Sequence, residues 1–203
     1  MHVEFLVEEL SAETALKELL PKILGEAITF GIRTHEGKLD LLRSLPNRLR
    51  GYKAMLNGNY DLRIVVLVDR DSEDCRSRKA HLEDVATDAG LVTKSRANGG
   101  NFQVLNRLAI QELEAWFFGD CEAVAQAYPG FDPQLWRKSR YRDSDAIDHT
   151  WETLGLELQK VGHHQGRYEK VRGAREIASH MAPSRNRSPS FQAFCSGLLD
   201  LVR

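Results

Sequence analysis

One apolar run constrains the fold of this chain more than any other feature of its sequence. Residues 62–69 read LRIVVLVD, so branched aliphatic side chains fill successive positions and do not alternate with polar ones. Strands of this kind are buried on both faces, as in parallel sheets that are covered by helices. The run ends at Asp69, and Asp71 follows two positions later, so carboxylates stand at the carboxyl end of the strand. We therefore expect an α/β protein built around this strand.

Strand and helix patterns alternate along the first part of the chain. Strands are expected at 3–7, 27–34, 62–69, 91–95 and 102–110. Helices are expected at 12–24, 38–56 and 73–89. Ser11 is expected to cap the first helix, and Pro46 to kink or split the second. The pattern predicts an α/β domain over 1–118, with a mostly parallel sheet flanked by helices, and a helical C-terminal region over 119–203 packed on it.

The overall composition is that of a soluble globular protein. Of 203 residues, 42% are hydrophobic and 28% charged, and no apolar run approaches the roughly 20 residues of a spanning helix. The first residues lack the basic segment of a signal peptide. The cysteines, Cys75, Cys121 and Cys195, have no metal-binding or redox spacing, which favours a cytoplasmic protein with reduced thiols. No Walker motif is present, so ATP hydrolysis would have to come from another protein.

Acidic residues follow two of the predicted strands. Glu8 comes directly after the first strand, and Asp69 and Asp71 stand at the end of the apolar run. Parallel neighbouring strands would bring their carboxyl ends, and these side chains, to one edge of the sheet. Clustered carboxylates repel one another and are stabilised by a hard divalent cation such as Mg²⁺, for which Mn²⁺ can substitute. Capping of the next helix is the alternative explanation for Asp71, as it is for Asp74.

This arrangement resembles the Toprim fold of topoisomerases, primases and nucleases of the overcoming-lysogenization-defect type. A first strand that ends in an acidic residue and a later apolar strand that ends in D-x-D carry the likeness. The Toprim signature has Val-Glu-Gly where this chain has Val7-Glu8-Glu9, so either Glu8 or Glu9 is the ligand, and alignment on Val7 favours Glu8.

The chain also resembles the Toprim-like domain-of-unknown-function family 4276. The likeness is carried by VEELSAETALKELLPKIL at 7–24, VLVDRDSEDC at 66–75, AIQELEAWFFGD at 109–120, YEKVRGAREIA and RSPSFQAF. The resemblance implies a component of a prokaryotic antiviral defence system, often encoded beside an ATPase partner.

A second acidic pair, Glu112 and Glu114, follows the last predicted strand. Glu112 is a candidate catalytic residue and Glu114 a candidate metal ligand, which would complete the site or hold a second ion. The alternative is that both are solvated or ion-paired beside an aromatic core segment. Whether one or two metals bind stays open.

Basic and aromatic residues recur in the C-terminal region, as expected for a surface that holds a phosphate backbone. The best candidates for nucleic-acid contact are Tyr168, Lys170, Arg172 and Arg187, because they lie in the family-like stretches. A solvated surface is the alternative. His163 and His164 form a pair that could act as base or ligand, although such pairs in loops are more often exposed.

The sequence thus predicts a Mg²⁺-dependent nuclease. Glu8, Asp69 and Asp71 would hold the metal, with Glu112 or Glu114 adding a ligand or orienting water. Two alternatives stay open: a non-catalytic Toprim-like module that binds an ATPase or nucleic acid, and an enzyme that acts on small nucleotides. The choice between DNA and RNA and the formation of a homo-oligomer are also open.

Overall fold

The apolar run forms β3 (Leu62–Asp69), an inner strand of a four-stranded sheet with the order β2-β1-β3-β4. The computed structural model describes residues 1–70 and 74–203. The other strands are β1 (His2–Val7), β2 (Thr29–Thr34) and β4 (Val104–Ala109). Each neighbouring pair is parallel. The predicted α/β class with a mostly parallel sheet is therefore confirmed.

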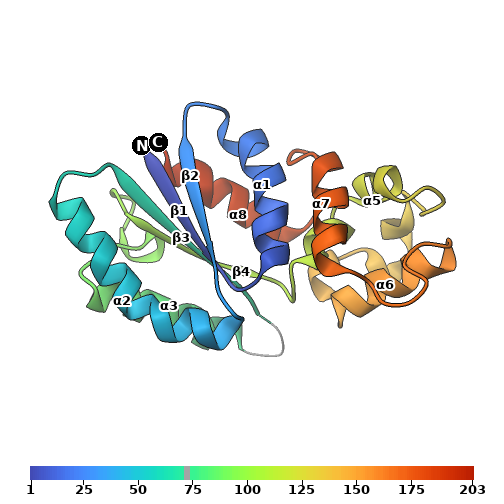
Figure 1. Ribbon diagram of the computed structural model, residues 1–203, viewed down its shortest axis with the longest axis horizontal. Helices are drawn as coiled ribbons and strands as arrows, with labels where there is room; N and C mark the ends of the chain where they lie inside the picture. Colours follow the sequence, from blue (N-terminus) through green and yellow to red (C-terminus); the bar gives the residue numbers. More distant parts are fainter. Residues whose placement is uncertain (71–73) are drawn as a thin grey trace.

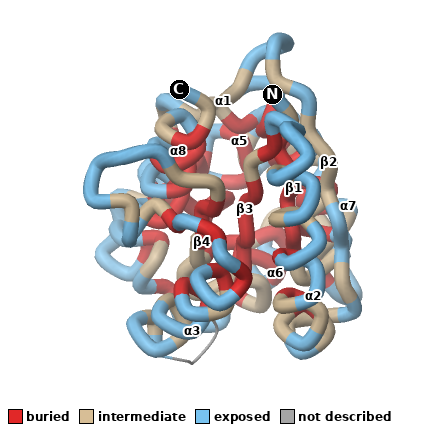
Figure 2. Tube along the Cα trace, turned by 90° about the vertical axis from the view of Figure 1, so that its left-hand side faces the viewer, coloured by how far each residue is buried: buried red, intermediate tan, exposed pale blue. Residues whose placement is uncertain are grey.

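Helices cover both faces of this sheet (Figure 1). One face carries α2 (Lys38–Asn57) and α3 (Cys75–Asp88), and the other carries α1 (Leu10–Leu24) and α8 (Pro189–Leu201). Figure 2 shows β1 and β3 as largely buried segments between these layers. The sheet therefore has no solvent-facing side along its inner strands, as the unbroken apolar run predicted.

The side chains of β3 divide between two apolar clusters. Val65 and Leu67 join the cluster shared with α1 and α8, whereas Ile64, Val66 and Val68 join the cluster shared with α2 and α3. Successive side chains of a strand point to opposite faces, so this division follows directly from the pleat. Burial on both faces accounts for the unbroken apolar run of this strand.

Two expectations about local structure are wrong, and one of the two alternatives for Pro46 is excluded. Residues 91–95 do not form a strand: Thr93 makes an isolated bridge to Val104, and the Arg96 amide bonds back to the Thr93 carbonyl and closes a 3₁₀ turn, η1 (Lys94–Arg96). Ser11 does not cap α1, because the helix begins at Leu10 and the Ser11 hydroxyl donates to Glu9 Oε1. Pro46 does not split α2, which continues through it.

The chain leaves the sheet after β4 and returns to it as α8. Between these two elements lie α4 (Glu114–Phe118), α5 (Cys121–Ala127), α6 (Thr150–Lys160) and α7 (Lys170–His180), with the 3₁₀ turns η2 (Leu135–Arg137), η3 (Ser139–Tyr141) and η4 (Ser144–Ala146). No strand occurs in the described residues of this region, as predicted. Figure 1 shows α5, α6 and α7 together at one end of the molecule. In residues 1–70 and 74–203, no helix is long and apolar enough to cross a membrane.

Candidate functional site

The carboxyl ends of β1 and β3 bring Glu8 and Asp69 together. β1 pairs with β3 up to Val7 opposite Leu67, and β3 continues beside β4 to Asp69, so Glu8 and Asp69 lie at the same end of the strands. The Asp69 backbone amide donates a hydrogen bond of 2.8 Å to Glu8 Oε1. The predicted pairing of these two residues across parallel neighbours is therefore present, although they are far apart in the sequence. Asp71 lies outside the described residues.

The side chain of Asp69 stands in a strongly unfavourable electrostatic environment. Burial raises its pKa well above the usual value, and the nearby Glu8, Glu114 and Glu9 raise it further. Each neighbouring carboxylate disfavours the ionised form of the others. The edge of the sheet is therefore a cluster of carboxyl groups that raise one another's pKa, and Lys170 is the cation that opposes the shift at Asp69.

Glu114 is the most deeply buried member of this cluster. It is the first residue of α4, its exposed fraction is 0%, and neither carboxylate oxygen has a hydrogen-bond partner among the described residues. Burial raises its pKa to about 7, with Lys170 opposing the shift and Glu112 and Glu9 adding to it. Buried polar groups almost always have partners. Both oxygens of this buried carboxylate are therefore available to a ligand as far as the described residues show.

Lys170 supplies positive charge to this edge. It is the first residue of α7, and its Nζ lies 3.6 Å from Glu9 Oε1. Burial lowers its pKa, but Glu114, Glu9, Glu112 and Asp69 together outweigh that effect and the net shift is upward. Lys170 therefore stays protonated among the carboxylates. Sequence reasoning selected Lys170 for contact with nucleic acid and did not place it beside the acidic residues.

Glu8 and Glu9, the two alternatives for the metal ligand after β1, have different partners in the structure. Glu8 accepts from the backbone of β3, and its charge is the largest carboxylate influence on the pKa of Asp69. Glu9 accepts from the Ser11 hydroxyl at 2.5 Å and pairs with Lys170. Glu8 is thus tied to the strand that carries Asp69, whereas Glu9 is tied to α1 and α7.

Glu112 lies close by but has a structural partner. Its Oε2 accepts from the Thr150 hydroxyl at 2.6 Å and from the Trp151 amide at 3.1 Å, both in the first turn of α6. The bond from the Trp151 amide satisfies a donor that the helix N-terminus leaves open. Its carboxylate therefore fixes the start of α6 at the edge of the acidic cluster. Asp74 likewise acts as a cap, because its Oδ2 accepts from the Ser77 amide at the start of α3.

The other candidates for nucleic-acid contact all have contacts within the protein. Tyr168 is 4% exposed, and its hydroxyl has no hydrogen-bond partner in the described residues, so little of its ring is open to a ligand. Arg172 is exposed and pairs with Glu176 at 2.9 Å. Arg187 lies over the ring of Trp136, 3.4 Å from its centroid. Their contact with nucleic acid stays a prediction.

The histidine pair lies in a separate contact network. His163 Nε2 lies 2.9 Å from the Pro129 carbonyl, and His164 Nε2 lies 2.8 Å from the Tyr128 hydroxyl. The His164 ring also packs against Tyr168. Burial lowers the pKa of His164, which favours the neutral ring. Both rings therefore have partners in the protein, and neither is among the groups that shift the pKa of Asp69.

The chemistry of the acidic cluster fits a hard divalent cation. Its donors are carboxylate oxygens, the ligands that Mg²⁺ prefers, and Glu114 brings oxygens that no described residue uses. Within residues 1–70 and 74–203, no three carboxylate, histidine or cysteine side chains are spaced to hold one ion. The set described here does not include Asp71, the third predicted ligand.

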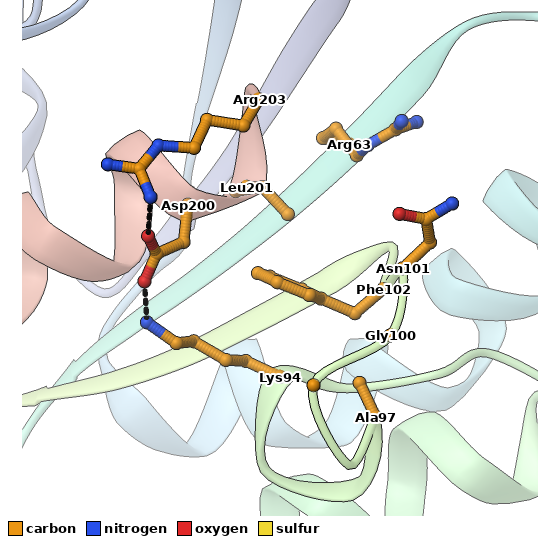
Figure 3. A pocket seen from close by; sticks show the side chains of 10 residues that line it. Arg63, Lys94, Ala97, Gly100, Asn101, Phe102, Asp200, Leu201 and Arg203 are labelled. Atoms are coloured by element: carbon orange, nitrogen blue, oxygen red, sulfur yellow. Dashed lines mark hydrogen bonds and ion pairs between the residues drawn. The ribbon is translucent and has the colours of Figure 1, made fainter.

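A hollow of about 360 Å³ lies at the opposite edge of the sheet, between the start of β3 and the end of α8 (Figure 3). Arg63, Lys94 and Arg203 line it, and the Asp200 carboxylate pairs with Lys94 at 2.5 Å and with Arg203 at 3.1 Å. Phe102 also lines it. This hollow is distant along the strands from Asp69 and belongs to a different surface.

Parallel strands between helical layers, with carboxylates gathered beyond two strand ends, define an α/β protein with an acidic edge site. A family model described as "Domain of unknown function (DUF4276)" matches residues 7–199. The chain therefore belongs to this family, as its sequence stretches predicted. The comparison with curated proteins found no match, and the comparison with solved structures found none either. The more distant Toprim relationship stays a prediction.

Proposed function

We propose that this protein is a Mg²⁺-dependent nuclease that hydrolyses phosphodiester bonds of nucleic acid. The observation that carries the proposal is the hydrogen bond that joins Glu8 to Asp69 beyond the carboxyl ends of parallel strands, at a place where the charge of Glu114 also raises the pKa of Asp69. Ligands of open α/β sheets bind at this edge. Repelling carboxylates at such an edge gain stability from a bound cation.

Glu8, Asp69 and Glu114 would hold the metal, together with Asp71. A bound Mg²⁺ or Mn²⁺ would supply an activated water and stabilise the leaving oxygen. Of the two glutamates that follow β4, Glu114 is the better ligand or proton acceptor, because its oxygens have no described partner while Glu112 Oε2 is held by α6. Glu112 then acts by fixing α6, and with it Trp151, beside the site.

Lys170 would contact a phosphate oxygen of the substrate. Its ammonium already lies 3.6 Å from Glu9 and is held protonated by the surrounding acids. A protonated lysine beside a metal site reduces the repulsion between the carboxylates and the phosphate backbone. The family resemblance extends the proposal to a cytoplasmic effector of a defence system that works with an ATPase.

Metal binding is the first test, because it does not require the substrate to be known. We expect Mg²⁺ or Mn²⁺ at millimolar concentration to raise the melting temperature of the purified chain, since binding to the folded state stabilises it by mass action. Asp69→Asn should abolish the shift and leave a folded protein, because the change removes charge from a repelling cluster. Glu26→Gln, an exposed acid at the far end of α1, should keep the wild-type shift.

Cleavage is the second test. Single- and double-stranded DNA and RNA, and free nucleotides, are incubated with wild type and Asp69→Asn in Mn²⁺, and the assay is repeated with any ATPase that is found encoded beside this chain. Cleavage of a polymer by the wild type, and not by Asp69→Asn, supports the proposed nuclease. Cleavage that persists in Asp69→Asn, or activity confined to free nucleotides, would overturn it.

A non-catalytic module is the second candidate, and Lys170 is the observation that favours it. An internal ammonium among carboxylates can replace the metal as the counter-charge. In that case metal would not change the melting temperature of the wild type, and it would not change that of Asp69→Asn either. The acidic edge would then be a surface for binding a partner.

A further inference from the structure

Trp151 stands at the rim of the acidic edge, in the first turn of α6. Its ring is half-buried and lines a shallow hollow of about 250 Å³ together with Gly155, Leu156, Gly166 and Arg167. Leu156 is 57% exposed, and the two glycines add no side chain to the hollow. The hollow therefore has an aromatic wall that is open to solvent, and the polar side chains of Glu152 and Gln159 also line it.

Two cations lie over the ring of Trp151. Arg167 Cζ is 5.7 Å and Lys170 Nζ is 5.5 Å from the ring centroid. An aromatic ring flanked by positive charge is the arrangement that binds single-stranded nucleic acid, because the ring stacks on a base while the cations meet the backbone. Arg167 is exposed and can therefore move aside for a base.

Two contacts join this hollow to the acidic edge. The Trp151 amide donates to Glu112 Oε2 at 3.1 Å, so the position of the residue is set by a member of the acidic pair after β4. Lys170 lies over the Trp151 ring and also 3.6 Å from Glu9. One lysine therefore contacts both the aromatic ring of the hollow and a carboxylate of the acidic edge.

We propose that this hollow receives an unpaired nucleobase of the strand whose phosphate lies at the acidic edge. The inference rests on the proposed function for the phosphate and specifies its substrate class: a single strand, or an unpaired segment within a folded nucleic acid. A base inside a duplex has neighbours on both faces and reaches a protein ring only after extrusion, at an energetic cost. Discrimination between single and double strands follows from the Trp151 side chain.

Binding of an oligothymidylate of about 12 nucleotides, measured by fluorescence anisotropy with Ca²⁺ in place of Mg²⁺, tests the proposal. Trp151→Ala should weaken binding by about 10- to 100-fold, the usual effect of losing one stacked base. Trp151→Phe should recover most of the affinity because a ring remains. Trp151→Leu keeps apolar volume against the core but has no ring, so it should bind as weakly as Trp151→Ala and guards against a folding defect.

Two controls sharpen the result. Tyr60→Ala removes an aromatic ring that is 64% exposed before β3, at the other edge of the sheet, and should bind as wild type does. A duplex of the same length should bind wild type and Trp151→Leu equally. Wild-type affinity of Trp151→Leu for the single strand, or no single-strand binding by wild type, would overturn the proposal.

Failure of the proposed nuclease gives a different result. If the single strand still binds through Trp151 but metal produces no shift in melting temperature and no cleavage, the hollow is a nucleic-acid contact of a non-catalytic protein. If metal binding and cleavage depend on Asp69 while Trp151→Leu binds and cleaves single strands as wild type does, the nuclease stands and the base subsite is wrong.

Discussion

At the scale of single residues, the ionisation of Glu114 should lower the stability of the folded protein. Its pKa rises from 4.5 to about 7 because the side chain is buried. The folded protein holds this proton up to about pH 7, whereas the unfolded chain releases it near its ordinary pKa. Stability therefore falls as pH rises between these two values and is constant above them. The full effect is about 3 kcal/mol.

The variant Glu114→Gln tests this linkage. With EDTA present, the free energy of unfolding from urea titrations should fall less between about pH 5 and about pH 8 than in wild type, by about 2–3 kcal/mol. Asp69, whose pKa is also raised, retains its own contribution in the variant. Glu26→Gln removes an exposed carboxylate and should keep the wild-type dependence. An unchanged pH dependence in Glu114→Gln would show that this carboxyl ionises at its ordinary pKa.

At the scale of elements, Asp120 connects α5 to the segment between α7 and α8. It is 2% exposed, and its carboxylate accepts from the Ala123 amide at the start of α5 and from the Ala182 amide. Arg185 donates two further hydrogen bonds to this carboxylate, from Nε at 2.7 Å and from Nη2 at 3.0 Å. One carboxylate thus caps a helix and anchors the end of α7, the helix that carries Lys170.

Loss of this carboxylate should destabilise the protein substantially. Asp120→Ala leaves the amides of Ala123 and Ala182 without their acceptor, and we expect the free energy of unfolding to fall by about 2–4 kcal/mol. Glu122→Ala is the matched control, because Glu122 lies 3.3 Å from the same Arg185 but its side chain is 57% exposed. Its effect should stay within about 1 kcal/mol. Urea titration compares the two, and equal effects would contradict the anchoring role.

The same scale shows what the sequence could predict. The sheet follows from local patterns: the run at 62–69 demands burial on both faces, and strand ends place Glu8 beside Asp69. The strand expected at 91–95 fails because its backbone closes a turn on Thr93, a choice that the apolar pattern does not encode. Lys170 reaches the acidic edge only because α7 packs on α1. The spacing of residues within either helix does not predict this contact between two distant segments.

Only part of the candidate site can be predicted from the sequence, as is the case for the fold. Glu8 and Asp69 could be placed from strand ends, whereas the different environments of Glu112 and Glu114 could not, because they depend on α6. Periodicity gives the face of a helix but not which distant helix will cover it. Trp151 was missed for the same reason. Its signal in the sequence is only an aromatic residue with cations some 16–19 positions later, at Arg167 and Lys170.

At the scale of the whole molecule, one apolar core joins the sheet to the C-terminal region. The cluster that contains Phe5 of β1 also contains Phe191 and Phe194 of α8. Trp116 of α4 lies between them, with ring centroids 5.1 Å from Phe191 and 5.0 Å from Phe194, and its indole nitrogen donates to Ser190 Oγ at 3.0 Å. Residues beyond 118 therefore complete the same core that the strands begin.

A shared core should unfold as a unit. Phe194→Ala removes a fully buried ring from α8, and such changes cost about 3–5 kcal/mol. We expect the urea midpoints measured by far-UV circular dichroism and by tryptophan fluorescence to fall together, with an unchanged slope, because the strands and the C-terminal helices lose stability at once. Leu199→Ala, on the same helix but at a position that is 43% exposed, should change the midpoint little. A fluorescence midpoint that falls alone would mean that the C-terminal helices unfold independently. In that case, the positions of Lys170 and Trp151 at the acidic edge would depend on a separate equilibrium, and metal or nucleic acid would have to select the docked state.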